Sequence, residues 1–468
     1  MGSIDAAELP ATNTSSITSA LAAAQEAYTT AHPRSRKSHQ DACKYMPGGN
    51  TRTVLHTSPF PLTIHSAQSC YLTTADGHQY VDFLGEYTAG IYGHNSPIIR
   101  TAVEKALDDG WNYGAHSQSE QELARILCSR FAGIELVRFV NSGTEANMMA
   151  LATAIAVAKQ YGDYKKGVLL FEKGYHGSTI SGRAPSGKPS INLPHDFIVG
   201  QYNDVEGVKR LVSSIPEDSL AAILVEPMLG SGGCFAATNE FLQTLRDLAT
   251  QHRAILIFDE VMSSRLSYHG FGSIYGVLPD LTTLGKYLGG GMSFGAFGGR
   301  ADLMSLYDPR QGQLEHPGTF NNNVFTMQAG IAGASILTPE RLHALNSLGD
   351  LMRLEVEKLL AHHLPSGFGI VPSAPLTDSS PHDPTKAHPR RPPKMFIKGV
   401  GSLMCVHFAG PNRESLQGLF WHHMLEHGIY MAQRGFIALS IEITDAHVSQ
   451  FVAGVESFLR QWSSMLRW

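Results

Sequence analysis

Three short segments carry residue types that could bind an anion, hold a buried carboxylate and supply a reactive amine. The first is residues 141–147, NSGTEAN, which follow an apolar run and begin a helical pattern. Free backbone N–H groups in the first turn of a helix, together with the hydroxyls of Ser142 and Thr144, form a site suited to a phosphate group. Taken alone, the segment fits an ordinary serine N-cap followed by a turn glycine at least as well.

The second segment places an acid at the end of an apolar run. Residues 254–258 are all apolar, and Asp259 follows them directly. An unpaired buried carboxylate is very costly, so Asp259 needs a partner. A protonated ring nitrogen would supply one, whereas a structural aspartate that caps the next element is the alternative for this segment alone.

The third segment sets one lysine among apolar and small residues. Lys286 follows Thr283-Leu284-Gly285 and precedes three consecutive glycines at 289–291. Desolvation lowers the pKa of a lysine and makes its amine a nucleophile that can form a Schiff base with an aldehyde. A lysine whose amine extends to the surface is the alternative.

The three segments together predict a pyridoxal 5′-phosphate site. A phosphate cup, a buried acid and a nucleophilic lysine match the phosphate, the ring nitrogen and the aldehyde of that cofactor. The cup would consist of Ser142, Gly143 and Thr144. Asp259 would keep the ring nitrogen protonated, and Lys286 would carry the cofactor as a Schiff base. We therefore predict Lys286 and Asp259 as the catalytic residues.

Apolar strands that alternate with helices must position these segments. Near-continuous apolar runs are typical of strands buried on both faces of a parallel sheet, and the apolar spacing at 241–252 predicts a helix. Such alternation indicates an α/β fold whose ligands lie at the carboxyl ends of the strands. The predicted strands are 136–140, 168–171, 221–225 and 254–258.

A smaller α+β domain is predicted after about residue 330. Its elements are a helix at 337–360, a strand at 401–408, a helix at 416–427 and a strand at 437–443. The Pro-rich stretch 372–394 is interpreted as a surface insertion. The chain is therefore divided into an N-terminal segment that contributes to the small domain and the active site (1–85), a large cofactor-binding domain (86–330) and a C-terminal small domain (331–468).

Composition and charge argue against several other functions. Of 468 residues, 16% are charged and 43% are hydrophobic, and a net charge of −5 with no long basic run argues against a nucleic-acid-binding protein. No apolar stretch of about 20 residues occurs, so no membrane span is predicted. The five cysteines are scattered without a Cys-x-x-Cys pair, which argues against a metal site or a disulfide framework and favours a cytoplasmic protein.

The motifs resemble those of the class III (fold type I) aminotransferases that use pyridoxal phosphate. The resemblance covers roughly residues 40 to 460 and implies a large domain with a mostly parallel sheet beside a smaller α+β domain. It is carried by Ser142-Gly143-Thr144-Glu145-Ala146, Gly174-Tyr175-His176-Gly177, Val225-Glu226-Pro227, Phe258-Asp259-Glu260-Val261, Thr283-Leu284-Gly285-Lys286 and His316-Pro317-Gly318-Thr319-Phe320.

Two subgroups of that class share further stretches with the chain. Pro47-Gly48-Gly49 and the glycines at 289–291 resemble glutamate-1-semialdehyde 2,1-aminomutase, which moves an amino group within one molecule. The chain is more similar to aromatic β-amino acid (β-phenylalanine) aminotransferases at residues 83–90, 259–265, 291–299 and 318–323. This resemblance implies amino transfer from an aromatic β-amino acid or related amine to a keto acid such as 2-oxoglutarate or pyruvate, with the aminomutase reaction as the alternative.

The resemblance also implies roles around the cofactor. Tyr175 matches an aromatic residue that stacks on the ring, and Val261 belongs to a cofactor-binding motif. Glu226 is expected to support the Asp259 region or a hydrogen-bond network on the substrate side. Thr319 matches a residue that reaches the cofactor phosphate of the neighbouring subunit, so we predict a homodimer. His176 is expected to be structural.

Two arginines are candidate clamps for substrate carboxylates. Arg52 follows Pro47-Gly48-Gly49-Asn50, and Arg434 precedes the last predicted strand. Arginine binds carboxylates through two parallel hydrogen bonds, whereas a surface ion pair is the alternative for each. Arginines at matching positions of the resembling β-amino acid enzymes bind substrate carboxylates. We predict that Arg52 holds the β-carboxylate of the donor and Arg434 the α-carboxylate of the acceptor.

Overall fold

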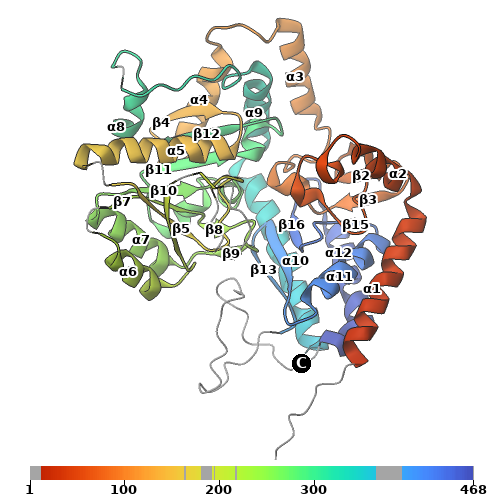
Figure 1. Ribbon diagram of the computed structural model, residues 1–468. Helices are drawn as coiled ribbons and strands as arrows, with labels where there is room; N and C mark the ends of the chain where they lie inside the picture. The colour runs from red at the N-terminus through yellow and green to blue at the C-terminus, as the bar shows by residue number, and fades with distance from the viewer. Residues whose placement is uncertain are drawn as a thin grey trace, which may run out of the picture.

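The computed structural model describes residues 12–162, 165–180, 192–193, 195–216, 219–311, 313–364 and 393–466. Within them the chain forms a large domain around a seven-stranded sheet and a smaller domain in which two further sheets meet long helices (Figure 1). Residues 372–392 of the expected Pro-rich insertion lie outside the described residues. Among the described helices, none is both long and apolar enough to cross a membrane.

The large sheet has the strand order β4-β12-β11-β10-β7-β5-β6. Every neighbouring pair is parallel except the two that involve β12, which runs antiparallel to both β11 and β4. The predicted, mostly parallel sheet is therefore confirmed. The strands span Leu136–Val140 (β4), Gly167–Phe171 (β5), Asp196–Gly200 (β6), Leu220–Val225 (β7), Ile255–Asp259 (β10), Leu281–Gly285 (β11) and Gly295–Gly299 (β12).

Helices cover both faces of this sheet, which explains the near-continuous apolar strands. Side chains alternate between the faces along each strand. Ile223 and Leu256 pack with residues of α6 (Val205–Ser214) and α7 (Asn239–Gln251), whereas Leu224 and Ile257 pack with residues of α5 (Gly143–Ala158). Figure 1 shows α5 on one side of the strands and α6 and α7 on the other.

Shorter elements complete the large domain. A hairpin of two short strands follows β7 and leads into α7. Helices α3 and α9 pack against each other, and α4 packs against α9. The bounds are Met228–Leu229 (β8), Phe235–Ala236 (β9), Pro97–Asp109 (α3), Gln118–Arg130 (α4), Ala301–Met304 (α8) and Val324–Ile336 (α9).

The small domain contains an antiparallel sheet in the order β13-β14-β16 with three helices. The predicted strand 401–408 begins at Leu403 instead, because Gly401 turns the chain with a φ of +55°. The predicted strand 437–443 ends at Ala438, because Leu439 and Ile441 donate to Ser402 and Ile91 outside the ladder. The bounds are Met395–Val400 (β13), Leu403–Phe408 (β14), Phe436–Ala438 (β16), Pro339–His363 (α10), Arg413–Glu426 (α11) and Asp445–Trp462 (α12).

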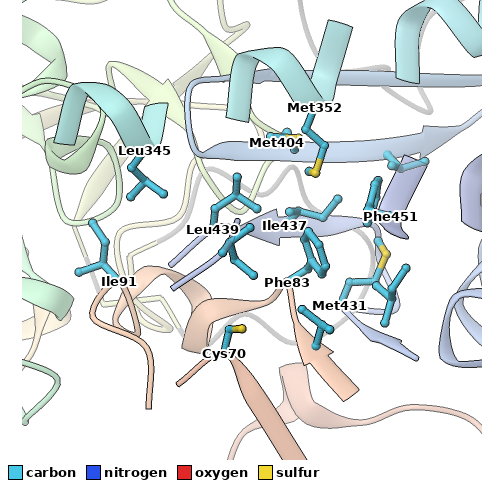
Figure 2. Close-up of a cluster of buried hydrophobic side chains, with 14 of the residues drawn as sticks. Cys70, Phe83, Ile91, Leu345, Met352, Met404, Met431, Ile437, Leu439 and Phe451 are labelled. Atoms are coloured by element: carbon cyan, nitrogen blue, oxygen red, sulfur yellow. The ribbon is translucent and has the colours of Figure 1, made fainter. Parts of the chain in front are cut away.

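Strands from the two ends of the sequence pair in the four-stranded sheet β1-β2-β3-β15. Val81 of β3 pairs in parallel with Ile429 of β15, and Phe83 packs beside Ile437 and Phe451 in the core of this domain (Figure 2). The chain segments that carry Arg52 and Arg434 are thereby held in one domain. The bounds are Ile64–Gln68 (β1), Tyr71–Thr74 (β2), Gln79–Asp82 (β3), Ile429–Tyr430 (β15), Thr12–Ala31 (α1) and Pro33–Ala42 (α2).

Candidate active site

The three segments singled out by sequence meet at the carboxyl edge of the large sheet. Ser142 follows β4, Asp259 is the last residue of β10, and Lys286 follows β11. Strands β10 and β11 are neighbours, and only β12 separates β11 from β4. The carboxyl edge of an open α/β sheet is the usual place for a ligand. The structure thus brings together the phosphate cup, the buried acid and the lysine.

The start of α5 combines a helix cap with a candidate phosphate site. The Ser142 Oγ atom accepts a hydrogen bond from the Glu145 N–H at 3.2 Å, so the serine does cap the helix. The N–H groups of Gly143 and Thr144 have no partner within the helix, because they belong to its first turn. A Cβ atom on Gly143 would lie 2.8 Å from the Val261 Cγ1 atom. Glycine is therefore required there, and the exposed backbone can bind an anion closely.

Asp259 is 3% exposed and is held by three donors. Its Oδ1 atom accepts from the Val261 N–H at 3.0 Å, and its Oδ2 atom accepts from the Asn147 Nδ2 at 2.8 Å. The His176 Nδ1 atom also lies 2.8 Å from Oδ2. The side chain cannot rotate without losing these bonds, so its carboxylate has a fixed orientation.

Sequence reasoning missed the contribution of Asn147. Besides Asp259, the Asn147 amide donates to the His176 carbonyl at 3.1 Å and accepts from the Thr283 hydroxyl at 2.7 Å. It thereby joins α5, the loop after β5 and strand β11 around the carboxylate. The available signal was its spacing, because Asn147 lies four residues after Gly143 and hence on the same face of α5.

Lys286 lies in a strained and desolvated position. Its φ is +55°, a left-handed value that residues other than glycine adopt rarely, and such strain is common at active sites. Burial is the main cause that lowers the pKa of the Lys286 amine to about 8; the positive charges of Arg52 and Arg434 act in the same direction, and Asp259 and Glu86 oppose the shift. About a tenth of the amine is therefore uncharged at pH 7, far more than for an ordinary lysine, and this form can act as a nucleophile.

Tyr175 and Glu226 lie on loops after two neighbouring strands. The Tyr175 side chain is 41% exposed, although its backbone N–H donates to the buried Glu226 Oε2 at 3.0 Å. The other oxygen of Glu226 accepts from the Gly230 N–H at 3.0 Å. Burial, together with the charge of Asp259 and against that of His176, raises the pKa of Glu226 to about 7. Glu226 thus fixes the backbone that presents the Tyr175 ring.

The two predicted clamp arginines meet at one aromatic ring. The guanidinium carbons of Arg52 and Arg434 each lie 5.5 Å from the centre of the Tyr87 ring. Arg52 forms an ion pair with Glu86, and the Arg434 Nη1 atom donates to the Ser231 hydroxyl at 2.8 Å. The charges of both arginines contribute to the lowered pKa of Lys286. Segments far apart in the sequence therefore place two cations beside the lysine.

Thr319 is exposed and lines a groove on the surface of the large domain. The groove has a volume of about 870 Å³ and is lined by residues 111–117, Glu120, Thr319, Phe320 and residues 322–324. Asn321, two residues further on, accepts a hydrogen bond from the Asn141 side chain at 3.1 Å. The segment around Thr319 therefore lies beside the start of α5 and is exposed to solvent there.

The residues at this edge fit pyridoxal phosphate. A Cβ atom on Gly177 would lie 2.5 Å from the Thr144 hydroxyl, so both this loop and the start of α5 need glycine where a phosphate would sit. Asp259 offers a fixed acceptor in a dry environment, and the Lys286 amine is activated. The exposed Tyr175 ring is free to stack on a flat ligand. The start of α5 therefore suits the phosphate of the cofactor, Asp259 its ring nitrogen and Lys286 its aldehyde.

Comparison with known proteins identifies the family. Residues 54–365 match the family model Aminotransferase class-III. The chain belongs to this family. It is therefore an aminotransferase of fold type I with pyridoxal phosphate as cofactor, and these three predictions are confirmed.

Two relatives cover almost the whole chain. Beta-phenylalanine transaminase of Variovorax paradoxus is 43% identical over 462 residues, which are 96% of this chain and 98% of that protein. The crystal structure of a beta-phenylalanine aminotransferase from the same species matches with a TM-score of 0.86 and 42% identity, over 96% of this chain and 99% of that one. Glutamate-1-semialdehyde 2,1-aminomutase 2 of Lachnoclostridium phytofermentans is 33% identical over 457 residues, 92% of this chain and 99% of that protein.

Proposed function

We propose that this aminotransferase moves an amino group from an aromatic β-amino acid, or a related amine, to a keto acid such as 2-oxoglutarate or pyruvate. The observation that carries the proposal is the pair of arginines on the Tyr87 ring beside Lys286. A β-amino acid has its carboxylate one carbon further from the amino group than an α-amino acid has. Two separate cations suit an enzyme that must bind both geometries in turn.

In this proposal Lys286 and Asp259 carry out the proton chemistry. Pyridoxal phosphate supplies an electron sink and a carrier for the amino group when it is bound. The Lys286 Nζ atom would accept the proton that the amino-bearing carbon of the donor loses and would pass it on, not back to that carbon, during transfer, for which an amine with a pKa of about 8 is well suited. Asp259 accepts a hydrogen bond from the protonated ring nitrogen, and its buried site strengthens that charge-assisted bond.

Other residues hold the cofactor in place. Ser142, Gly143 and Thr144 bind the phosphate at the start of α5. The Tyr175 ring stacks on the cofactor, and Glu226 supports it through the Tyr175 backbone. Val261, whose methyl groups lie against Gly143 and Gly285, contacts the cofactor beside the phosphate cup. Together these contacts hold the reacting carbon near Lys286.

Arg52 and Arg434 bind the carboxylates of different substrates. Arg52 binds the β-carboxylate of the donor, and Arg434 binds the α-carboxylate of the acceptor. Each arginine packs against the buried Tyr87 ring, which holds the two cations side by side. Arg434 must move aside when the aromatic side chain of the donor enters.

The protein acts as a homodimer in the cytoplasm in this proposal. The exposed Thr319 and the groove around it leave room for a second subunit, whose cofactor phosphate Thr319 would reach. A charged fraction of 16% suits an extensive interface, because obligate interfaces are poor in charge. Five free thiols suit a reducing compartment. An active monomer in sedimentation at micromolar concentration would contradict the dimer.

The proposal also keeps the division of the chain at residues 85 and 330. The pairing of β3 with β15 supports the assignment of residues 1–85 to the small domain. The seven strands of the large sheet all lie within residues 86–330. Residues 331–468 contribute the helices α10, α11 and α12 and the sheet β13-β14-β16.

A panel of donors tests the proposed reaction. Purified protein with pyridoxal phosphate is supplied with α-amino acids, β-amino acids and amines without a carboxylate, each with pyruvate or 2-oxoglutarate. Turnover of aromatic β-amino acids with stoichiometric consumption of the keto acid supports the proposal. The alternative reaction is intramolecular transfer of the aminomutase type, which the 33% identical relative favours. Product formation without consumption of any keto acid would support that alternative.

A further inference from the structure

Arg52 and Arg434 differ in the partner that each holds. Arg52 forms an ion pair with the Glu86 carboxylate. Arg434 donates to the hydroxyl and carbonyl of Ser231, which are neutral. The positive charge of Arg52 is therefore compensated within the chain, whereas that of Arg434 is not compensated by Ser231. A substrate carboxylate therefore competes with a charged group at Arg52 and with a neutral hydroxyl at Arg434.

The backbone around Glu86 is held in a strained turn. Gly85, Glu86, Tyr87 and Thr88 have φ values of +53°, +48°, +51° and +85°. Three of these four residues carry a Cβ atom, so each pays a conformational penalty, and such runs persist only where neighbouring contacts enforce them. The run places Glu86 against Arg52 and the Tyr87 ring against both arginines.

Contacts on both sides of this turn enforce it. The buried Asp82 carboxylate accepts from the N–H groups of Leu84 and Gly85 at 2.8 and 3.1 Å. A Cβ atom on Gly85 would lie 2.5 Å from the Ala438 carbonyl oxygen, so the turn is pressed against β16. The Tyr87 hydroxyl donates to the Val54 carbonyl at 3.1 Å, two residues from Arg52. The position of Glu86 is thus set by the fold rather than by the ion pair alone.

We propose that Glu86 is a specificity-determining residue: its carboxylate occupies Arg52 until the carboxylate of a donor displaces it. The inference rests on the proposed role of Arg52 in donor binding. A donor carboxylate that takes the Arg52 Nη1 atom must displace the Glu86 Oε1 atom from it, and a donor without a carboxylate leaves the Arg52–Glu86 pair intact. Glu86 therefore lowers the affinity for carboxylate donors and keeps Arg52 compensated when a simple amine binds.

The expected size of this effect follows from the exposure of the pair. The Arg52 and Glu86 side chains are 44% and 55% exposed, and exposed ion pairs are weak. Release of Glu86 should therefore change the affinity for a carboxylate by roughly 2- to 5-fold. At this strength the Glu86 carboxylate weakens the binding of donors that have a carboxylate, relative to donors that have none, but does not prevent it.

The test compares Glu86→Gln with the wild-type holoenzyme. Calorimetry measures the Kd of 3-phenylpropanoate, which has the carbon skeleton and carboxylate of β-phenylalanine but no amino group. Kinetics measures KM for β-phenylalanine and for 1-phenylethylamine, which has no carboxylate. Glu456→Gln is the control, because Glu456 pairs with Arg460 on α12 in a similarly exposed ion pair. In Glu86→Gln the Kd and the KM for β-phenylalanine should fall roughly 2- to 5-fold, and the KM for 1-phenylethylamine should not fall.

A double-mutant cycle separates competition at Arg52 from a general charge effect. In the Arg52→Gln background, Glu86→Gln should no longer change the Kd of 3-phenylpropanoate. An unchanged or higher Kd in the single variant, or an equal fall in both backgrounds, would overturn the inference. Failure of the wild-type enzyme to transaminate β-phenylalanine would contradict the proposed function instead, because the calorimetric comparison does not depend on turnover.

Discussion

His176 Nδ1 and Asp259 Oδ2 lie 2.8 Å apart, and their side chains are 1% and 3% exposed. Asn147 donates to the same oxygen, so two residues from different elements fix one oxygen of this carboxylate. A buried carboxylate is expensive unless it is fully hydrogen-bonded. The hydrogen bonds from Asn147 and His176 offset this cost. They also hold the carboxylate in one orientation, which a hydrogen-bond partner for a ring nitrogen requires.

Asp259→Asn should retain cofactor binding and lose most of its activity. A neutral amide cannot stabilise a protonated ring nitrogen, and a hydrogen bond to a charged group contributes about 1.5–3 kcal/mol. We expect kcat to fall at least roughly 10-fold. Steady-state kinetics with saturating pyridoxal phosphate checks this. A variant with wild-type kcat would make Asp259 a structural residue only.

The lowered pKa of Lys286 predicts how fast the cofactor-free protein takes up pyridoxal phosphate at each pH. The amine attacks only when it is uncharged, and burial lowers its pKa from 10.5 to about 8. The rate of attachment, followed by absorbance, should therefore rise with pH and level off above about pH 8. A rate that keeps climbing toward pH 10.5, as for an exposed lysine, would show that the site does not lower the pKa.

Arg52→Ala and Arg434→Ala should affect different substrates. Loss of a charge-assisted contact costs about 1.5–3 kcal/mol, which is roughly 10- to 150-fold in KM when binding is at equilibrium. We expect Arg52→Ala to raise KM for a β-amino acid and Arg434→Ala to raise KM for 2-oxoglutarate. Equal effects of each variant on both substrates would mean that the two arginines form one shared carboxylate site.

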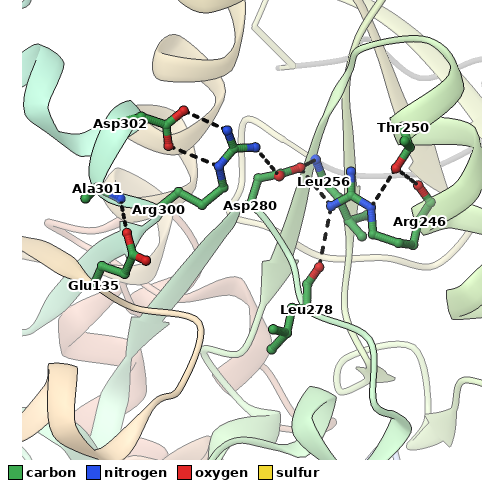
Figure 3. A network of polar contacts seen from close by, with 9 residues as sticks. All are labelled: Glu135, Arg246, Thr250, Leu256, Leu278, Asp280, Arg300, Ala301 and Asp302. Atoms are coloured by element: carbon green, nitrogen blue, oxygen red, sulfur yellow. Dashed lines mark hydrogen bonds and ion pairs between the residues drawn. The ribbon is translucent and has the colours of Figure 1, made fainter.

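An ion network at the other edge of the large sheet should control stability without affecting chemistry. Asp280, at the amino end of β11, accepts from Arg246 and Arg300 at 2.9 Å each and from the Leu256 N–H at 2.8 Å (Figure 3). Asp280→Asn removes the buried negative charge that Arg246 and Arg300 share and should cost about 2–3 kcal/mol. Thermal unfolding should shift to lower temperature while kcat/KM stays at the wild-type value.

The matched control for this network is Asp302→Asn. Asp302 also binds Arg300, but its side chain is 61% exposed. An exposed ion pair contributes about 0–1 kcal/mol, so the unfolding temperature should change little. Equal destabilisation by both variants would contradict the assignment of Asp280 as the centre of the network.

The cofactor side of the predicted site lies on segments at the carboxyl ends of strands in the large sheet. Asp259 ends β10 and Lys286 directly follows β11, so the topology of a parallel sheet brings them to one edge. The glycine-rich strand β12 was not predicted, because glycine is unfavourable in strands. Its glycines are required by close packing: a Cβ atom on Gly295 would lie 2.2 Å from the Ser142 carbonyl oxygen.

The substrate side of the site could not be read from local sequence. Tyr87 contacts Arg52 and Arg434 only because β3 pairs with β15 and joins segments more than 300 residues apart in sequence. Glu86 adopts a left-handed conformation without being glycine, and no propensity indicates this. Ser231 reaches Arg434 from the hairpin β8–β9 of the other domain. Such contacts depend on tertiary packing.

The most direct test of the account is a half-reaction without an acceptor. Wild-type holoenzyme and Lys286→Ala loaded with pyridoxal phosphate are each mixed with excess β-phenylalanine, and the released keto acid is quantified. The account predicts that the wild-type protein releases one keto acid per bound cofactor and then stops until 2-oxoglutarate is added, whereas Lys286→Ala releases almost none. Continued turnover without an acceptor, or equal product from both proteins, would contradict amino transfer through Lys286.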